Sequence, residues 1–335
     1  DGAEWSRLEG VSPFAQGPGA ATYSANTIVD FAGIMARYVK IKMNSAYGPL
    51  GQYGLSEVRF FHIPILAREA KPDDGSTVSG VDVVLNWRAG REAFSHQVYL
   101  GTSATNLALL GTSAENTFAT GLLSYDTVYY WQIVEVNEAE TPSAHAGDIW
   151  SFATPAYALI DDFETYDDDC KRIFFAWADG LGHNGGAEIE GCDVPASNGN
   201  GGGSIVGNST APFAERTIVS AGRQSLPLSY DNAFGPSEAS LSLDGQDWSA
   251  GGLNKLSLSF YGTEGNTGQL YVKINNTKLT YSGDASSISL AEWQAWVIDL
   301  SEVGGNLQNV QTLTIGVDGA NAAGMLYIDE IGLYP

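Results

Sequence analysis

Aromatic and hydrogen-bonding side chains alternate with apolar ones in two short segments, 256–261 and 269–275. If both segments are β-strands, side chains of one parity face a core and those of the other parity face outward. The outward set comprises Tyr261, Tyr271, Lys273 and Asn275. Tyrosine rings stack on the CH-rich faces of pyranose sugars, and amide and ammonium groups hydrogen-bond to sugar hydroxyls. The pattern predicts one sheet face able to bind a glycan; the alternative is an ordinary solvent-facing surface, or a face covered by a neighbouring domain.

The chain has two cysteines, Cys170 and Cys192, which flank glycine-rich sequence. In an exported protein such a pair predicts a disulfide that closes a loop and stabilises the fold by roughly 3 kcal/mol in the chain-entropy model. Two free thiols are the alternative. A zinc site is a weaker interpretation, because His183 is the only histidine nearby.

Motifs for catalysis are missing from the sequence. It has four histidines, none of them beside a serine or cysteine nucleophile motif. It contains no G-x-S-x-G, P-loop, H-E-x-x-H or dinucleotide-binding glycine pattern. Paired carboxylates for glycoside cleavage can come from distant strands, and Glu215, Asp231 and Glu238 are available, but nothing selects them from the 39 acidic residues. The sequence therefore predicts that the protein is not an enzyme.

The elements that must position the outward side chains are β-strands. Segments rich in β-branched and aromatic residues recur about every 8–12 positions between Gly, Asn, Asp and Ser turns, which is typical of sandwiches and barrels. Glycine supplies 40 of the 335 residues, in keeping with many tight turns. We therefore expect an all-β fold built from tandem β-sandwiches.

Residues 1–66 resemble the C-terminal half of a discoidin domain, the coagulation factor 5/8 type C fold. The resemblance is carried by an Asp-Gly-Ala-Glu-Trp motif at 1–5 and by segments at 36–41 and 54–60. The alternation of residues 38–42 predicts a strand there. The resemblance covers about half of a jelly roll, so the strands that would complete both sheets are missing. We expect other segments or other chains to complete residues 1–66, and we expect no ligand site there.

Residues 67–155 resemble a fibronectin type III module. The resemblance rests on apolar and aromatic segments at 84–87, 97–100, 127–131 and 150–152. It implies a β-sandwich that acts as a spacer, with Trp87 and Trp131 in its core. The polar segment 67–75, which contains Pro72, is typical of a connector leading into this module.

Residues 156–335 resemble the galactose-binding-like jelly roll found among carbohydrate-binding modules. Segments at 160–164, 292–300 and 326–331 carry the resemblance. The order of the three units, with the segment 224–232 in the third, is similar to large secreted proteins of planctomycete-type bacteria. The resemblance implies a jelly roll and a glycan-binding role.

Such jelly rolls often hold a structural calcium ion where their first and last strands lie side by side. Carried over residue by residue, the resemblance places Glu164 and Asp329 at the acidic positions, with Asp162 as a third candidate ligand. Calcium takes about six to eight oxygen ligands. Residues 156–335 hold 23 acids and seven bases, so clustered carboxylates there would repel one another without a cation. The alternative is that these acids are solvated strand ends.

Net charge narrows the choice of partners. The 16 Lys and Arg against 39 Asp and Glu give a formal charge of −23, which argues against nucleic acid and anionic membranes. No apolar run approaches the roughly 20 residues that span a bilayer. A neutral glycan is favoured over a sulfated or uronate polymer, unless calcium bridges the charges.

These observations predict a non-catalytic carbohydrate-binding region of a larger exported protein, extracellular or at the cell surface, with a jelly roll stabilised by calcium. The alternative is a structural or adhesive cell-surface component that assembles with other chains and binds no glycan specifically.

Overall fold

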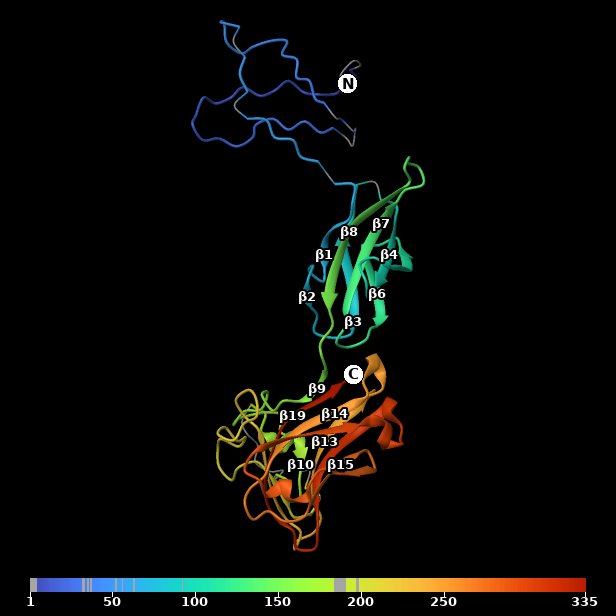
Figure 1. Cartoon of the computed structure of the whole chain (residues 1–335). Coiled ribbons are helices and arrows are strands. Elements are labelled where there is room, and N and C mark those ends of the chain that lie inside the picture. Colours follow the sequence, from blue (N-terminus) through green and yellow to red (C-terminus); the bar gives the residue numbers. More distant parts are fainter. Residues whose placement is uncertain are drawn as a thin grey trace. The chain divides into compact units, whose positions relative to one another are not determined.

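The structure is a computed structural model that describes all residues except 1–4, 32, 33, 35, 37, 52, 56, 63, 92, 184–190, 197 and 198. Its contacts divide the chain into two compact units, Asp1–His62 and Ile63–Pro335. Strands dominate the second unit (Figure 1). The predicted all-β fold is confirmed. Within the described part of the chain, no helix is both long and apolar enough to cross a membrane.

The described residues of the first unit form neither helix nor strand. The predicted strand at 38–42 is therefore wrong, whereas positions 1–4, 37 and 56 of the discoidin-like segments lie outside the described residues. Large apolar side chains are exposed in this unit, Ile28 at 89% and Phe61 at 88%. The physical reason is that a strand forms only where neighbouring strands accept its backbone hydrogen bonds and cover its apolar side chains, and the described residues of this unit form no such neighbours.

The second unit begins with two sheets that enclose an apolar core. The strands of the first sheet are, in spatial order, β1 (Arg68–Lys71), β3 (Asp82–Arg88) and β6 (Thr117–Leu122). Those of the second are β2 (Ser76–Thr77), β8 (Ala144–Ala153), β7 (Val128–Val136), β4 (Ser95–Gly101) and β5 (Ala108–Ser113).

Alternation along these strands builds the core of this first sandwich. Trp87 and Trp131 are 5% and 0% exposed, as their positions predict. The predicted connector at 67–75 is in part a strand, because β1 pairs with β3. The polar composition of β1 misleads here, since only Ala70 of its four residues is buried.

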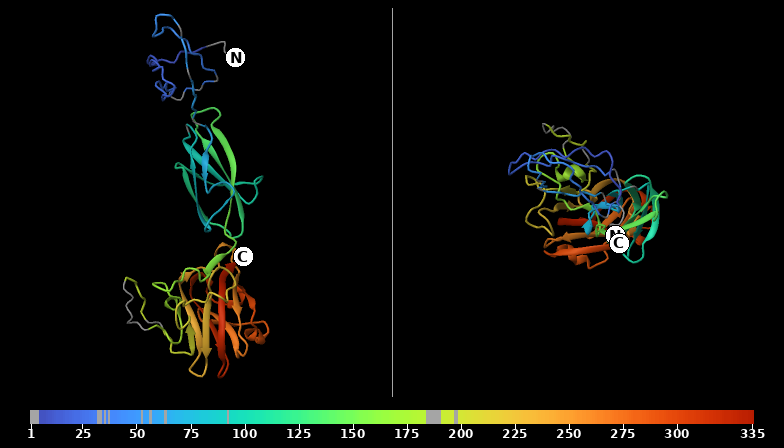
Figure 2. Two further views of the ribbon diagram at one scale, coloured as in Figure 1. Left: turned by 90° about the vertical axis from the view of Figure 1, so that its left-hand side faces the viewer. Right: turned by 90° about the horizontal axis from the view of Figure 1, so that it is seen from above.

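Residues from Ala158 onward form a second sandwich of one six-stranded and one five-stranded sheet (Figures 1 and 2). The six-stranded sheet has the order β11 (Ser204–Val206), β12 (Leu226–Asp231), β19 (Ala323–Tyr334), β14 (Lys255–Tyr261) and β17 (Trp293–Asp299), with β9 (Ala158–Asp161) also paired to β19. The five-stranded sheet has the order β10 (Trp177–Ala178), β13 (Ser237–Gln246), β18 (Val310–Asp318), β15 (Gln269–Ile274) and β16 (Thr277–Thr280).

Short helical turns connect these strands. They are α1 (Ile173–Ala176), η1 (Ala250–Gly252), η2 (Ala285–Ser289), η3 (Leu300–Val303) and η4 (Leu307–Asn309).

One apolar core joins the two sheets of the second sandwich. Leu256, Leu258 and Phe260 enter it from β14, and Leu270 and Val272 enter it from β15, all with 0% exposure. Because side chains alternate along a strand, the remaining parity of each sheet points away from this core. The sandwich therefore presents two outer faces, on opposite sides, to whatever binds it.

Candidate functional site

The predicted glycan-binding residues do not share one face. Tyr261 lies on β14 of the six-stranded sheet, whereas Tyr271 and Lys273 lie on β15 of the five-stranded sheet. The core sides of both strands meet in the same apolar cluster. Their outward side chains consequently point to opposite sides of the sandwich, and the prediction of a shared face is wrong.

Tyr271 is enclosed by its own sheet. It is 2% exposed, and its hydroxyl donates a 2.6 Å hydrogen bond to Oε1 of Glu238. The ring lies against Gly316, where an added Cβ would come within 2.4 Å of Tyr271 Cζ. The Lys278 ammonium lies 3.7 Å from the ring centroid. Tyr271 therefore offers no free ring face to a sugar.

Lys273 and Asn275 also have partners within the sheet. The Lys273 ammonium pairs with Glu238. Burial favours a higher pKa for Glu238, but the hydrogen bonds from Lys273 and Tyr271 outweigh it and lower that pKa. Asn275 Oδ1 accepts hydrogen bonds from the backbone N–H of Gln311 at 2.8 Å and of Thr312 at 3.3 Å. These side chains stabilise the five-stranded sheet.

On the opposite outer face, three aromatic residues stand in register on adjacent strands. Tyr261 is directly opposite Tyr327 of β19 on one side and Trp293 of β17 on the other. Opposite residues of antiparallel strands share a face. The ring centroid of Tyr261 lies 6.0 Å from that of Tyr327 and 5.6 Å from that of Trp293. We call Tyr327, Tyr261 and Trp293 the aromatic row.

The aromatic row is partly open to solvent, since all three side chains are half-buried. Its planes are inclined, at 76° between Tyr261 and Tyr327 and at 61° between Tyr261 and Trp293. With neighbouring strands about 4.8 Å apart, the outer two residues are separated by roughly 10 Å across the sheet. The row can therefore contact successive units of an extended ligand that crosses the strands.

Sequence reasoning found Tyr261 but missed its two neighbours. The parity of 326–331 was available as a signal, because Leu326 and Ile328 are core residues that leave Tyr327 facing outward. The register that brings Tyr327 and Trp293 beside Tyr261 is a long-range property of strand pairing and has no local signature.

A loop formed by residues 215–224 covers the same outer face next to the aromatic row. Asp329 lies two positions after Tyr327 on β19 and is fully buried. Its Oδ2 accepts hydrogen bonds from the backbone N–H of Ser220 at 2.8 Å and of Ala221 at 3.2 Å. Glu164 Oε1 accepts from Arg223 and Gln224 N–H at 2.6 and 3.0 Å. Carboxylates thus hold the 215–224 loop by its backbone.

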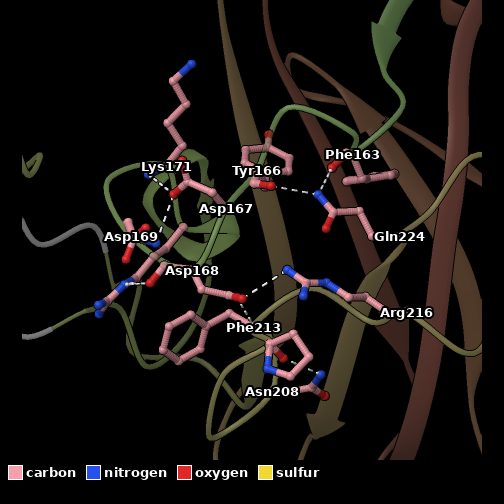
Figure 3. A network of polar contacts seen from close by, with 12 residues as sticks. Phe163, Tyr166, Asp167, Asp168, Asp169, Lys171, Asn208, Phe213, Arg216 and Gln224 are labelled. Atoms are coloured by element: carbon pink, nitrogen blue, oxygen red, sulfur yellow. Dashed lines mark hydrogen bonds and ion pairs between the residues drawn. The ribbon is translucent and has the colours of Figure 1, made fainter.

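Side chains fix both ends of the 215–224 loop (Figure 3). Asp168 Oδ2 pairs with the Arg216 guanidinium at 2.9 Å. The Gln224 amide donates to the carbonyl oxygens of Phe163 and Tyr166 at 2.6 and 2.8 Å. The 215–224 loop is therefore held in place by these contacts, next to the aromatic row.

The three predicted calcium ligands use their oxygens in these contacts. Besides the bonds of Glu164 and Asp329, Asp162 Oδ1 accepts from Glu164 N–H at 3.1 Å. Burial raises the pKa of Asp329 to about 6, in spite of the backbone N–H groups that favour its ionised form. Among the residues that the structure describes, no three or more His, Cys, Asp or Glu side chains form a group suited to a metal ion. The described residues therefore show no cluster of ligands for an ion, and calcium stays a prediction.

Cys170 and Cys192 are joined by a disulfide bond, with their Cα atoms 5.2 Å apart. Cys170 follows the acidic turn that contains Asp168. The bond therefore closes a covalent loop close in sequence to the turn that holds Arg216.

Comparison with known proteins does not establish a family for this chain. No protein-family model and no curated protein matches it. A family 11 carbohydrate-binding module from Clostridium thermocellum, in complex with a β-1,3-1,4-mixed-linked tetrasaccharide, is similar at 15% identity over 53% of this chain and 94% of that one, with a TM-score of 0.33. An Fn3-like protein from Clostridium thermocellum is similar at 18% identity over 28% of this chain and 96% of that one, with a TM-score of 0.23.

The K2 cleaved adhesin domain of Lys-gingipain is a third similar structure, at 10% identity over 52% of this chain and 94% of that one, with a TM-score of 0.30. All these scores and identities are low, so they transfer no function to this chain. The discoidin-like and planctomycete-type resemblances stay predictions.

Proposed function

We propose that residues 156–335 are a non-catalytic glycan-binding module of an exported multi-module protein, and that the aromatic row is its binding surface. The observation that supports this most is the register of Tyr327, Tyr261 and Trp293 across three adjacent strands. Three half-buried rings at one level of a sheet provide stacking area for a pyranose chain.

The geometry of the row favours an extended single chain as the ligand. The ring planes are inclined to one another by 61° and 76°, so they do not make the flat platform that a crystalline polymer surface would require. A glycan lying across β19, β14 and β17 would instead contact the rings one after another. The 215–224 loop would border that path on the side of Asp329.

Charge and redox chemistry support a neutral ligand and an exported setting. Residues 156–335 carry 23 acids against seven bases, which disfavours anionic polymers. The Cys170–Cys192 disulfide is of the kind that persists in oxidising compartments.

Calcium binding remains a separate proposal, with Asp162, Glu164 and Asp329 as the proposed ligands. Hydrogen bonds from the backbone N–H groups of Ser220, Ala221, Arg223 and Gln224 already occupy oxygens of two of these carboxylates. Thermal melting in calcium and in EDTA distinguishes a bound ion from anchoring by backbone N–H groups alone. A higher Tm in calcium supports the ion, and equal Tm values indicate that the N–H groups alone hold these carboxylates.

The alternative function is a structural or adhesive surface component. The observation that favours it is the exposure of large apolar side chains in the described residues of the first unit, such as Leu50 at 81% and Phe60 at 64%. Surfaces of this kind are typical of regions that other segments or chains cover.

Affinity electrophoresis against native polysaccharides tests the proposed function. We expect retardation by a neutral glycan, and we expect Tyr261→Ala and Trp293→Ala each to weaken binding by roughly tenfold or more, because each removes ring area from the centre or end of the row. Tyr99→Ala is the matched control, since Tyr99 is a half-buried tyrosine on an outer strand face of the first sandwich.

The two candidate functions give different results in this experiment. Absence of retardation by every glycan, for a protein whose melting curve is cooperative, contradicts glycan binding and favours the structural component. Retardation that is equally strong in the Tyr261→Ala and Trp293→Ala variants would place the site elsewhere.

A further inference from the structure

Glu215 places a fixed carboxylate on the same face as the aromatic row, near its Tyr327 end. Glu215 forms an isolated antiparallel bridge with Ser225. Ser225 is two positions before Pro227, which is directly opposite Tyr327 on β19. Since alternate residues of a strand and opposite residues of an antiparallel pair share a face, Glu215 lies on the outer face that bears the row.

Hydrogen bonds hold the Glu215 carboxylate in place and in its ionised form. Its Oε1 accepts from the backbone N–H of Thr217 at 2.6 Å and of Ile218 at 3.3 Å, and from the Thr217 hydroxyl. Partial burial opposes ionisation, but these bonds outweigh it and lower the pKa of Glu215. The carboxylate is therefore negative at neutral pH.

No neighbouring base cancels this charge in the part of the 215–224 loop where it lies. Arg216, the next residue, is turned to Asp168, which it contacts at 2.9 Å (Figure 3). Arg223, at the far end of the loop, is paired with Glu164 at 3.1 Å. The charge of Glu215 acts instead on the row, where it contributes to a raised pKa of the Tyr327 hydroxyl, after burial as the first cause.

We propose that Glu215 is a specificity-determining residue of the aromatic row, which repels uronate and sulfate groups and so restricts the site to uncharged sugars. This inference rests on the proposed glycan binding. The whole-chain charge of −23 acts on every surface and is screened within about 10 Å at ordinary salt, whereas a fixed charge beside the row acts over a shorter distance. Discrimination between neutral and acidic glycans should then depend on this one side chain.

The test compares each polymer with its own carboxylated form. Galactan, glucomannan and mixed-linkage glucan are run in affinity gels, native and after partial oxidation of their C6 hydroxyls to carboxylates. We expect the wild type to bind the oxidised form of its ligand more weakly than the native form. In Glu215→Gln, whose amide oxygen can still accept the loop hydrogen bonds, we expect this preference to shrink by roughly three- to tenfold, the effect of removing one partly screened charge at close range.

A matched control separates the local charge from the net charge. Glu138→Gln makes the same change in net charge at an exposed position in the first sandwich, and it should keep the wild-type preference. Raising the salt concentration should reduce the preference in the wild type and leave Glu215→Gln nearly unchanged. Melting curves of both variants check that the fold is retained.

The results distinguish failure of this inference from failure of the proposed function. Binding with the same preference in the wild type and in Glu215→Gln overturns the role of Glu215 and leaves glycan binding standing. No binding of any native or oxidised polymer overturns glycan binding itself, and the role of Glu215 with it.

Discussion

Tyr261 and Tyr271 illustrate how the surroundings of a residue decide its role. Both occupy outward positions of neighbouring strands in the chain, and local sequence treats them alike. Tyr271 is opposite a glycine, Gly316, so its ring settles against β18 and its hydroxyl reaches Glu238. Tyr261 is opposite two other aromatic residues, which keep its ring in the row. The first tyrosine stabilises the sheet, and the second is available for a ligand.

Glu238 makes a contribution to stability that depends on pH. Lys273 and Tyr271 lower its pKa in the folded protein, against the effect of burial. The contribution is therefore present above the ordinary carboxyl pKa and is lost as the pH falls through the lowered folded value. Between pH 6 and pH 3, we expect the free energy of unfolding of the wild type to fall by about 1 kcal/mol more than that of Glu238→Gln.

Urea denaturation at a series of pH values measures this difference. Glu138→Gln, at an exposed position, should follow the wild type. If the curves of wild type and Glu238→Gln stay parallel over the whole range, the ionised network around Glu238 does not stabilise the fold.

At the scale of elements, the alternation of apolar and polar residues predicted where strands form, but not to which sheet each strand belongs. The segments around Leu256–Phe260 and Leu270–Ile274 are strands with the expected buried parity. Nothing local states that consecutive strands enter different sheets, because that depends on pairing with β19 for one and β18 for the other. For this reason the glycan-binding face predicted from the sequence combined residues of β14 and β15, which belong to sheets on opposite sides of the sandwich.

The hydrogen bonds that hold the 215–224 loop were equally inaccessible to sequence reasoning. Ser220 and Asp329 are 109 positions apart, and Arg223 and Glu164 are 59 apart. Such contacts follow from the complete topology. The Cys170–Cys192 bond was predicted from the sequence because the chain has two cysteines, with two free thiols as the alternative.

The packing of Tyr271 against β18 of the five-stranded sheet requires a glycine at position 316. An added Cβ would lie 2.4 Å from Cζ of Tyr271, so Gly316→Ala must push the ring off β18 and break its bond to Glu238. We expect a loss of about 1–3 kcal/mol in the free energy of unfolding, as for other overpacked sites. Urea denaturation measures it, with Gly305→Ala as control, because the nearest atom to a Cβ there is 3.5 Å away.

A double variant identifies the cause of that loss. In a Tyr271→Ala background, Gly316→Ala should cost much less than it does alone, since the ring it displaces is absent. Additive losses would mean that Gly316 acts through its backbone and not through Tyr271.

At the scale of the whole molecule, the two units differ in what could stabilise them. The two apolar cores are built from residues between Ala67 and Leu333. In the first unit, the described residues form no strand and leave Ile28, Leu50 and Phe61 more than 80% exposed. By itself this unit buries too little apolar surface to offset the conformational entropy of ordering its chain.

Deleting residues 1–62 should therefore leave the stability of the rest almost unchanged. We expect the fragment 63–335 to melt within about 2 °C of the full chain, because a contribution of a few tenths of a kcal/mol shifts Tm by no more than that in a protein of this size. We also expect it to stay monomeric at higher concentration, since the exposed apolar side chains of the first unit favour association. Differential scanning calorimetry and light scattering measure the two effects. A clearly lower Tm for the fragment would mean that residues 1–62 stabilise the sandwiches. That result would favour a surface component built by assembly over a glycan-binding module.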